Sequence, residues 1–172
     1  MKKYLLGIVL ALTAAGAMAV DGYKGVKFGS SFENLQSAGL CDFKKANSQP
    51  NGQNVVVYNC LDFKFSGKDT IAAASFLDGK FGKLVIMVNS PAEPVIDALA
   101  KKYGGVSSSS TMEEIQNAPI TGKPVYVRFD HDTVVFKMEM AGKINIKHLI
   151  YTSPEFDKKM NETQASNISD DI

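Results

Sequence analysis

Apolar and polar residues alternate through much of the chain, with the period of two that is typical of a β-strand with one buried face. The clearest stretch runs from Val55 to Phe65, where Leu61, Phe63 and Phe65 alternate with Asp62 and Lys64. Short apolar or alternating runs bounded by turn residues predict further strands at residues 26–28, 71–77, 83–89, 124–129, 133–140 and 143–151.

Two details of this pattern predict how the strands are placed. Asp78-Gly79 lies between two predicted strands and indicates a tight hairpin, because glycine accepts the positive φ that such turns require. The run from Leu84 to Val88 has no polar alternation. We therefore expect this strand to be central in the sheet and covered on both sides.

Helices are predicted where capping residues precede apolar residues at helical spacing. Ser30 and Glu33 have the spacing of a capping box, which predicts a short helix that ends near Gly39. Ser90 with the following proline opens a second helix, and Gly104 ends it.

The segments that follow the second helix are more polar. Residues 104–110 are rich in glycine and serine and predict a flexible connector, after which Thr111-Met112-Glu113-Glu114 is expected to cap one or two further helical turns. Ser153 precedes a terminal helix. From Glu162 onward the residues lack apolar periodicity, which predicts a disordered tail.

These elements predict an α+β fold, with a mainly antiparallel sheet and helices packed on one of its faces. The order helix, three strands, helix, three strands fits a duplicated helix-plus-three-strand unit, and it also fits a simple α+β order without duplication. The predicted organisation is a signal peptide at 1–19, a single α+β domain at 20–161 and a disordered tail at 162–172.

The first residues carry the signature of an export signal. Lys2 and Lys3 precede an apolar run from Leu5 to Ala15, and Ala17-Met18-Ala19 matches the small-x-small pattern that signal peptidase recognises. A retained membrane anchor is the competing interpretation, but the run is shorter than the ~20 residues that a spanning helix needs. We expect cleavage between Ala19 and Val20, a periplasmic or secreted location, and no stable membrane insertion after cleavage.

Charge argues against nucleic acid as a partner. The chain has 19 Lys plus Arg and 18 Asp plus Glu, and removing the leader with its two lysines leaves the mature protein close to neutral. Arg128 is the one arginine of the sequence. Because capture of nucleic acid needs clustered cations, this composition disfavours it.

Cys41 and Cys60 are the two cysteines of the chain. In an oxidising compartment they are expected to form a disulfide with each other. A redox or catalytic thiol is the competing interpretation, but it calls for a C-x-x-C pair or a lone cysteine, and neither is present.

Candidate chemistry is sparse, and no catalytic residue, metal site or cofactor is predicted. Asp130-His131-Asp132 offers three potential ligands within three residues, which suggests a metal hypothesis. A polar hairpin tip is the simpler interpretation, because neighbouring side chains of a strand point to opposite faces. His148 shares its strand face with isoleucines and is expected to be a core or edge histidine, with a general base as the functional alternative.

Amphipathic side chains are the candidates for an exposed contact surface, because tyrosine combines an apolar ring with a polar tip. The predicted contact residues are Tyr58, Tyr126, His131 and Tyr151. For each tyrosine, packing in the core is the competing interpretation.

The segment Gly25-Val26-Lys27-Phe28-Gly29-Ser30-Ser31-Phe32, with a later helix ending in Lys102-Tyr103-Gly104, resembles an opening found in small exported bacterial proteins of unknown function. The order of elements from Val26 to Tyr151 is similar to the two-module folds of β-lactamase inhibitory proteins and small outer-membrane assembly lipoproteins. The chain departs from the lipoproteins because no cysteine stands at the predicted cleavage point. The resemblance implies a role in binding other proteins, and it transfers no contact residues.

Two functions follow from these observations. The sequence favours a non-enzymatic periplasmic or secreted module that binds a protein, as an inhibitor or an envelope accessory. The alternative is a small periplasmic hydrolase that uses His148 or the Asp130/His131/Asp132 cluster. The sequence leaves an enzymatic role open and favours its absence.

Overall fold

The computed structural model describes residues 19–48, 54–141 and 144–170, so the predicted leader at 1–18 lies outside the described residues. Short helices separate groups of strands along the chain. The elements are β1 (Gly22–Tyr23), β2 (Val26–Lys27), α1 (Phe32–Ser37), β3 (Lys44–Lys45), β4 (Val55–Phe65), β5 (Lys68–Leu77), β6 (Lys80–Met87), α2 (Ala92–Tyr103), β7 (Val106–Ser109), α3 (Met112–Thr121), β8 (Val125–Phe129), β9 (Val134–Ala141), β10 (Ile144–Thr152) and α4 (Pro154–Asp170).

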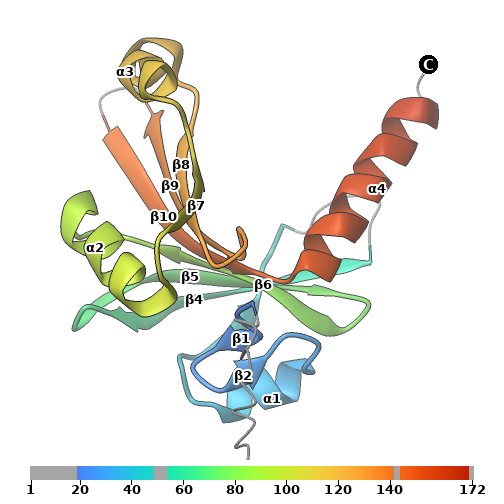
Figure 1. Cartoon of the computed structure of the whole chain (residues 1–172). Helices are drawn as coiled ribbons and strands as arrows, with labels where there is room; N and C mark the ends of the chain where they lie inside the picture. Colours follow the sequence, from blue (N-terminus) through green and yellow to red (C-terminus); the bar gives the residue numbers. More distant parts are fainter. Residues whose placement is uncertain (1–18, 49–53, 142–143, 171–172) are drawn as a thin grey trace, which may run out of the picture.

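One antiparallel sheet contains eight of these strands, in the order β3-β4-β5-β6-β10-β9-β8-β7, while β1 and β2 form a separate small hairpin. Each half of the large sheet is a meander whose last strand lies innermost, so β6 and β10 pair at the centre. The two halves run in clearly different directions in Figure 1. The predicted α+β fold with a mainly antiparallel sheet is confirmed.

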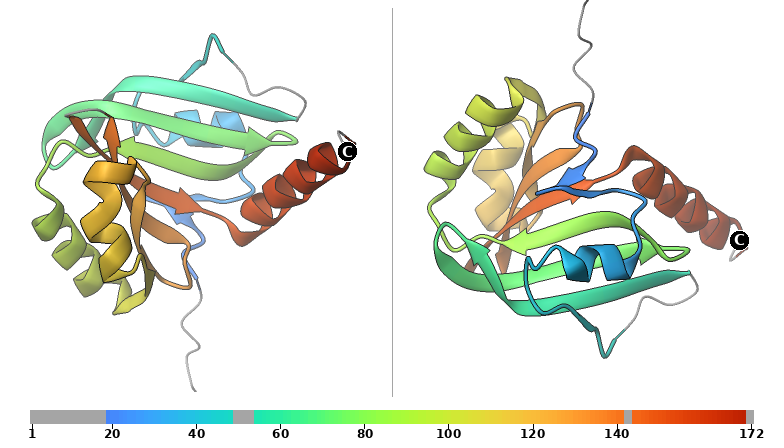
Figure 2. Two further views of the ribbon diagram at one scale, coloured as in Figure 1. Left: turned by 90° about the horizontal axis from the view of Figure 1, so that it is seen from above. Right: turned by 90° about the horizontal axis from the view of Figure 1, so that it is seen from below.

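The hydrophobic core lies between one face of the sheet and the helices. Leu35 of α1 and Leu99 of α2 belong to the same buried cluster as Phe76, Ile86 and Leu149 from the strands. In the view from below, α1 lies in front of β4–β6, whereas the view from above shows these three strands with no helix over them (Figure 2). The sheet therefore has one covered face and one open face.

The hairpin between β5 and β6 forms as the sequence predicts. Asp78 and Gly79 have φ of 52° and 75°, a pair of left-handed conformations that matches the right-handed twist of the flanking strands. The predicted disulfide is also present, and it joins Cys41, which follows α1, to Cys60 of β4. On the chain-entropy model, a closed loop of this size contributes about 3 kcal/mol to stability.

The strand from Leu84 to Val88 differs from its prediction in one respect. It is central, because β6 pairs with both β5 and β10. Leu84, Ile86 and Val88 are buried, but Val85 and Met87 between them are only half-buried. The expectation of cover on both sides is wrong, since α1 and α2 pack against one face and Val85 and Met87 are on the other.

The glycine- and serine-rich segment after α2 is ordered rather than a flexible connector. Residues 106–109 form strand β7, which pairs with β8 at the edge of the sheet. The capping box of Thr111 and Glu114 is present, and the helix that it opens, α3, runs for ten residues, longer than expected. At α1, by contrast, the N-cap is Ser31 and makes no side-chain capping bond, so the predicted box of Ser30 and Glu33 does not form.

Helix α4 continues to Asp170, although the sequence predicts disorder from Glu162. Its first turn is fixed to the sheet: the Ser153 amide donates to the Gly82 carbonyl at 2.9 Å, and the buried Phe156 ring packs on Gly82. Beyond this turn the helix projects away from the sheet (Figure 1). None of the helices in the described part of the chain is long and apolar enough to cross a membrane.

Candidate functional site

The open face of the sheet carries two rows of side chains that cross several strands. Residues directly opposite each other in an antiparallel pair point to the same side, so the strand register defines each row. The first row crosses six strands and consists of Asn59, Ala73, Val85, Ile150, Val135 and Arg128. The second row crosses four strands and consists of Met87, His148, Lys137 and Tyr126. We call these ten residues the open face.

Most of these side chains are half-buried by their neighbours in the sheet, while Asn59 is exposed and Val135 is buried. The centre of the surface is apolar, with Val85 opposite Ile150 and Met87 opposite His148. Charged groups lie nearer to β8 and β9, where the Arg128 guanidinium is 4.6 Å from the centre of the Tyr126 ring. An apolar centre with an aromatic and an arginine beside it is the composition typical of a protein-binding surface.

Ion pairing on β9 sets the electrostatics of the open face. Lys137 Nζ lies 2.8 Å from Glu139 Oε2, and this contact lowers the pKa of the Glu139 carboxyl. His148 is opposite Lys137 on the neighbouring strand. Burial, and next the charge of Lys137, lower the pKa of the His148 imidazole, while Glu139 acts in the opposite direction. His148 is half-buried on the open face, and its strand β10 pairs with both β6 and β9, so the expectation of a core or edge histidine is wrong.

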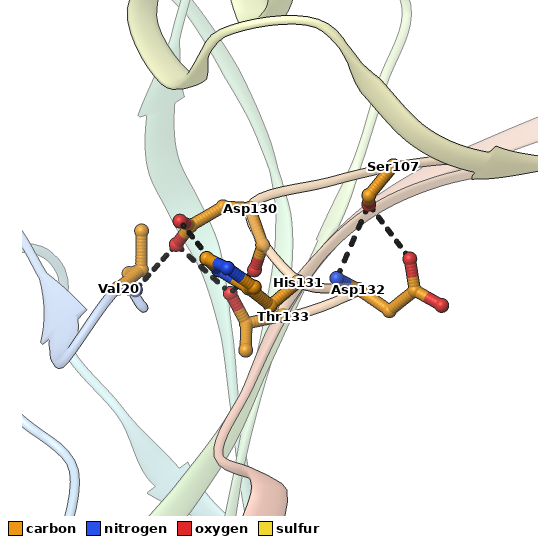
Figure 3. A network of polar contacts seen from close by, with 6 residues as sticks. All are labelled: Val20, Ser107, Asp130, His131, Asp132 and Thr133. Carbon is orange, nitrogen blue, oxygen red and sulfur yellow. Dashed lines mark hydrogen bonds and ion pairs between the residues drawn. The ribbon is translucent and has the colours of Figure 1, made fainter. Parts of the chain in front are cut away.

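The turn between β8 and β9 holds the acidic cluster that the sequence identifies (Figure 3). Asp130, His131 and Asp132 have φ of 51°, 55° and 67°, so three consecutive residues other than glycine adopt the left-handed conformation. This conformation costs free energy in L-residues and persists where surrounding contacts fix it. Thr133 supplies two such contacts, because its amide and its hydroxyl both donate to the Asp130 carbonyl.

The two carboxylates of this turn point to different partners. Asp132 accepts hydrogen bonds from the hydroxyls of Ser107 and Ser108 in β7, at 2.7 and 2.9 Å. Asp130 instead accepts from the Thr133 hydroxyl at 3.1 Å and from the backbone amide of Val20 (Figure 3). The side chains therefore diverge and do not form a common ligand set for a metal ion.

Among the described residues, one group brings three metal-ligating side chains together, namely Cys41, Cys60 and Asp62. Both of its sulfur atoms are joined in the disulfide, so they are not available as thiolate ligands. This arrangement gives no support to a metal centre at the disulfide.

The hydrolase hypothesis requires His148 or the acidic turn to meet other polar groups in a cleft. His148 is opposite Lys137 of β9, whereas Asp130, His131 and Asp132 lie in the turn before β9, which begins at Val134. The histidine and the acidic turn are therefore separated along β9.

A cavity of about 460 Å³ lies elsewhere, between the N-terminal segment, the β5–β6 hairpin and the start of α4. Its walls include Val20, Phe28, Phe81 and Phe156. Neither histidine lines it. The cavity is of a size that suits a small ligand, and its walls combine three phenylalanines with charged side chains such as Asp21 and Lys80.

The predicted contact residues occupy different environments. Tyr126 is half-buried on the open face, and the His131 side chain is 67% exposed at the acidic turn. Tyr58 lies on the covered face, where its ring stacks on Phe32 at 3.8 Å. Tyr151 is 3% exposed and its hydroxyl lies 3.2 Å from the Tyr103 hydroxyl, so it is a core residue and not part of a contact surface.

Sequence reasoning missed most of the open face. Val85 and Met87 lie in an unbroken apolar run, which gives no sign that alternate residues face different environments. The sequence also did not predict Ser107 and Ser108 as partners of Asp132, because a glycine- and serine-rich segment is typical of a linker. The alternation of apolar and charged residues at 136–140 was the one signal that could have pointed to an exposed face on β9.

Comparison with known proteins finds relatives without an assigned function. A protein-family model described as "Uncharacterised protein" matches residues 23–171. An uncharacterised protein of Haemophilus influenzae strain Rd is 30% identical over 173 residues, which cover 99% of this chain and 98% of that protein. No solved structure matches the chain.

Proposed function

Because the chain belongs to this family of uncharacterised proteins, its own surfaces are the basis for a functional assignment, and we propose that it is an exported, non-enzymatic module that binds a protein partner through its open face. The observation that carries the proposal is the uncovered side of the eight-stranded sheet. The first row is apolar across β5, β6, β10 and β9, and it gains stability when a partner removes it from water.

The polar groups of the open face suit a protein surface as the occupant. The Lys137–Glu139 pair and the Arg128–Tyr126 contact lie beside the apolar centre. They supply positive and negative charges together with hydrogen-bond donors and acceptors. A mixed surface of this kind is matched by a folded protein with an apolar patch and a complementary polar rim. The resemblance to β-lactamase inhibitory proteins, which act by binding other proteins, supports the same role.

Export is supported by three observations that are independent of the open face. The sequence begins with a segment that fits a signal peptide, and the Cys41–Cys60 disulfide suits an oxidising compartment. The family match begins at residue 23, beyond the predicted cleavage point after Ala19. On this basis the mature protein starts at Val20 in the periplasm or outside the cell.

Site-specific crosslinking in cells tests the binding role. A photoreactive amino acid replaces Met87 on the open face, and in a parallel strain it replaces Ile120, which is 86% exposed on α3. We expect a discrete adduct with one envelope protein from position 87 and none from position 120. The adduct partner is then purified and its affinity for the mature protein is measured directly.

A matched pair of charge substitutions completes the test. Val85→Lys places a cation in the apolar row and should weaken the measured affinity at least tenfold, since a lysine there must be desolvated on binding. Ile120→Lys adds the same charge away from the open face and should leave affinity unchanged. Equal crosslinking from both positions, or unchanged affinity of a folded V85K variant, would contradict the proposal.

A further inference from the structure

The carboxylate of Asp130 is largely shielded from water, and it has no permanent cation beside it among the described residues. Its side chain is 10% exposed, and the ion-pair partner among the described residues is His131, whose Nδ1 lies 3.6 Å from Oδ1 and whose side chain is 67% exposed. No lysine or arginine in the described part of the chain pairs with it. A buried carboxylate normally needs a cation or several hydrogen bonds to offset the loss of hydration.

The backbone nitrogen of Val20 is the group that does reach this carboxylate. It donates to Asp130 Oδ2 across 110 positions of sequence (Figure 3). The Val20 side chain packs against the hydrophobic core, which fixes the position of its backbone. A few residues later, the Phe28 amide donates to the Asp21 carbonyl at 2.7 Å, so the N-terminal segment is tied to the fold immediately after Val20.

We propose that Asp130 is a binding site for the α-ammonium group that export processing creates on Val20. The inference rests on the proposed export of the protein. Signal peptidase adds water across the Ala19–Val20 peptide bond, so that Ala19 leaves with a carboxylate and Val20 keeps an amine that takes up a proton. The nitrogen that donates one neutral hydrogen bond before cleavage then carries a positive charge and three donors.

The new α-ammonium group supplies the permanent cation that the Asp130 site lacks. A charge-assisted hydrogen bond is about twice as strong as a neutral one, and its gain is larger where water is partly excluded. The Thr133 hydroxyl already holds the same oxygen, Oδ2, at 3.1 Å and orients it towards Val20. Because Asp130 belongs to the left-handed turn between β8 and β9, the ion pair fastens the start of the mature chain to the second half of the sheet.

The test compares two forms of the disulfide-bonded protein. One form begins at Val20 with a free amine, and the other retains Gly-Ser-Ala before Val20, so that the same nitrogen remains a neutral amide. The extension is compatible with the fold, because Ala19 already has a place at the wall of the cavity beside Val20. We expect the Val20 form to melt about 5 °C higher.

Two substitutions show whether the difference belongs to Asp130. Asp130→Asn should lower the melting temperature of the Val20 form more than that of the extended form and remove the gap between them. Asp132→Asn is the matched control, because that carboxylate bonds to Ser107 and Ser108, and it should lower both forms equally.

Equal melting temperatures of the two unsubstituted forms would overturn the ion pair, and this comparison does not require any variant to fold. An equal fall in the melting temperature of both forms on Asp130→Asn substitution would overturn the ion pair as well. Intact-mass analysis of the exported protein tests the premise separately: a natural start at Val20 supports the proposal, and a start at another residue overturns it for the exported protein. Crosslinking at Met87 depends on neither result. A failure of the proposed binding role is therefore distinguishable from a failure of the Val20–Asp130 ion pair.

Discussion

His148 is a half-buried histidine whose charge depends on two neighbours of opposite sign. Lys137 is opposite it on β9, and Glu139 lies two residues further along the same strand. Burial and Lys137 both favour the neutral imidazole, whereas Glu139 favours the cation, and the net direction is a lowered pKa. The open face is thus adapted to carry a neutral histidine at neutral pH.

This direction predicts how His148 links stability to pH. The unfolded chain takes up a proton near the ordinary histidine pKa of about 6.5, before the folded chain does, so the free energy of unfolding falls as the pH drops below that value. His148→Gln should therefore flatten the fall in stability between pH 6.5 and the lowered pKa of the folded state. Urea unfolding at a series of pH values measures the slope.

The neighbours of His148 provide the controls. Lys137→Met removes a cation that lowers the histidine pKa and should make the slope shallower, while Glu139→Gln removes the opposing anion and should make it steeper. A His148→Gln variant with the same slope as the unsubstituted protein would show that this histidine does not contribute to the linkage.

At the residue level, the sequence could predict pairings whose chemistry is local or limited to two candidates. In a chain that is expected to be exported, the two cysteines have each other as partners, and Asp78-Gly79 has a turn preference of its own. The partners of Asp130 and Asp132 could not be predicted in this way. Val20 is 110 positions from Asp130, and Ser107 is 25 positions from Asp132, so both contacts depend on the completed sheet.

At the level of elements, the errors share one physical cause. Residues 106–109 have the composition of a linker, yet they form β7 because the edge of β8 offers unpaired backbone groups and Asp132 offers an acceptor for the serine hydroxyls. Helix α4 extends past Glu162 although its apolar periodicity ends. Apolar periodicity shows that one face of an element is buried. An element that is anchored at one end can form with little apolar periodicity.

Helix α4 is anchored where Phe156 packs on Gly82, and this contact predicts the effect of a small substitution. A Cβ at Gly82 would lie 2.2 Å from Phe156 Cδ2 and 2.8 Å from Phe156 Cβ, so a rotation of the ring alone does not make room for it. Gly82→Ala should displace the first turn of α4 and lower the free energy of unfolding by about 1–3 kcal/mol. Trypsin cleavage after Lys158 and Lys159 should become faster.

Gly105→Ala is the matched control, because a Cβ at Gly105 meets no atom within 4 Å. Its stability and its cleavage pattern should be unchanged. Cleavage of the Gly82→Ala protein at the unsubstituted rate would mean that α4 is not held by this contact.

At the level of the whole molecule, the two meanders join at one strand pair, β6 and β10, which we call the seam. Helices α1 and α2 contribute to one hydrophobic core that extends across this pair. The sequence could predict the α+β class and the succession of helices and strands, because each strand has its own pattern. It could not predict that the last strands of the two halves lie side by side, because antiparallel pairing across that distance leaves no local signal.

Leu149 tests whether the seam makes the molecule one cooperative unit. It is 2% exposed on β10, opposite Ile86 of the first half and Phe136 of the second, so it packs against both. Leu149→Ala should lower the free energy of unfolding by about 2–5 kcal/mol, because it removes buried contacts and leaves a cavity. Circular dichroism and tyrosine fluorescence should still follow one common urea transition.

Ile120→Ala on the exposed side of α3 is the control, and it should change stability by less than about 0.5 kcal/mol. If the Leu149→Ala protein unfolds in two separate transitions, the halves are stable on their own and the seam only docks them. If it unfolds in one transition at lower urea, the open face exists only while both halves are folded together. Its apolar row crosses the β6–β10 pair, so a partner bound there would stabilise the seam by mass action.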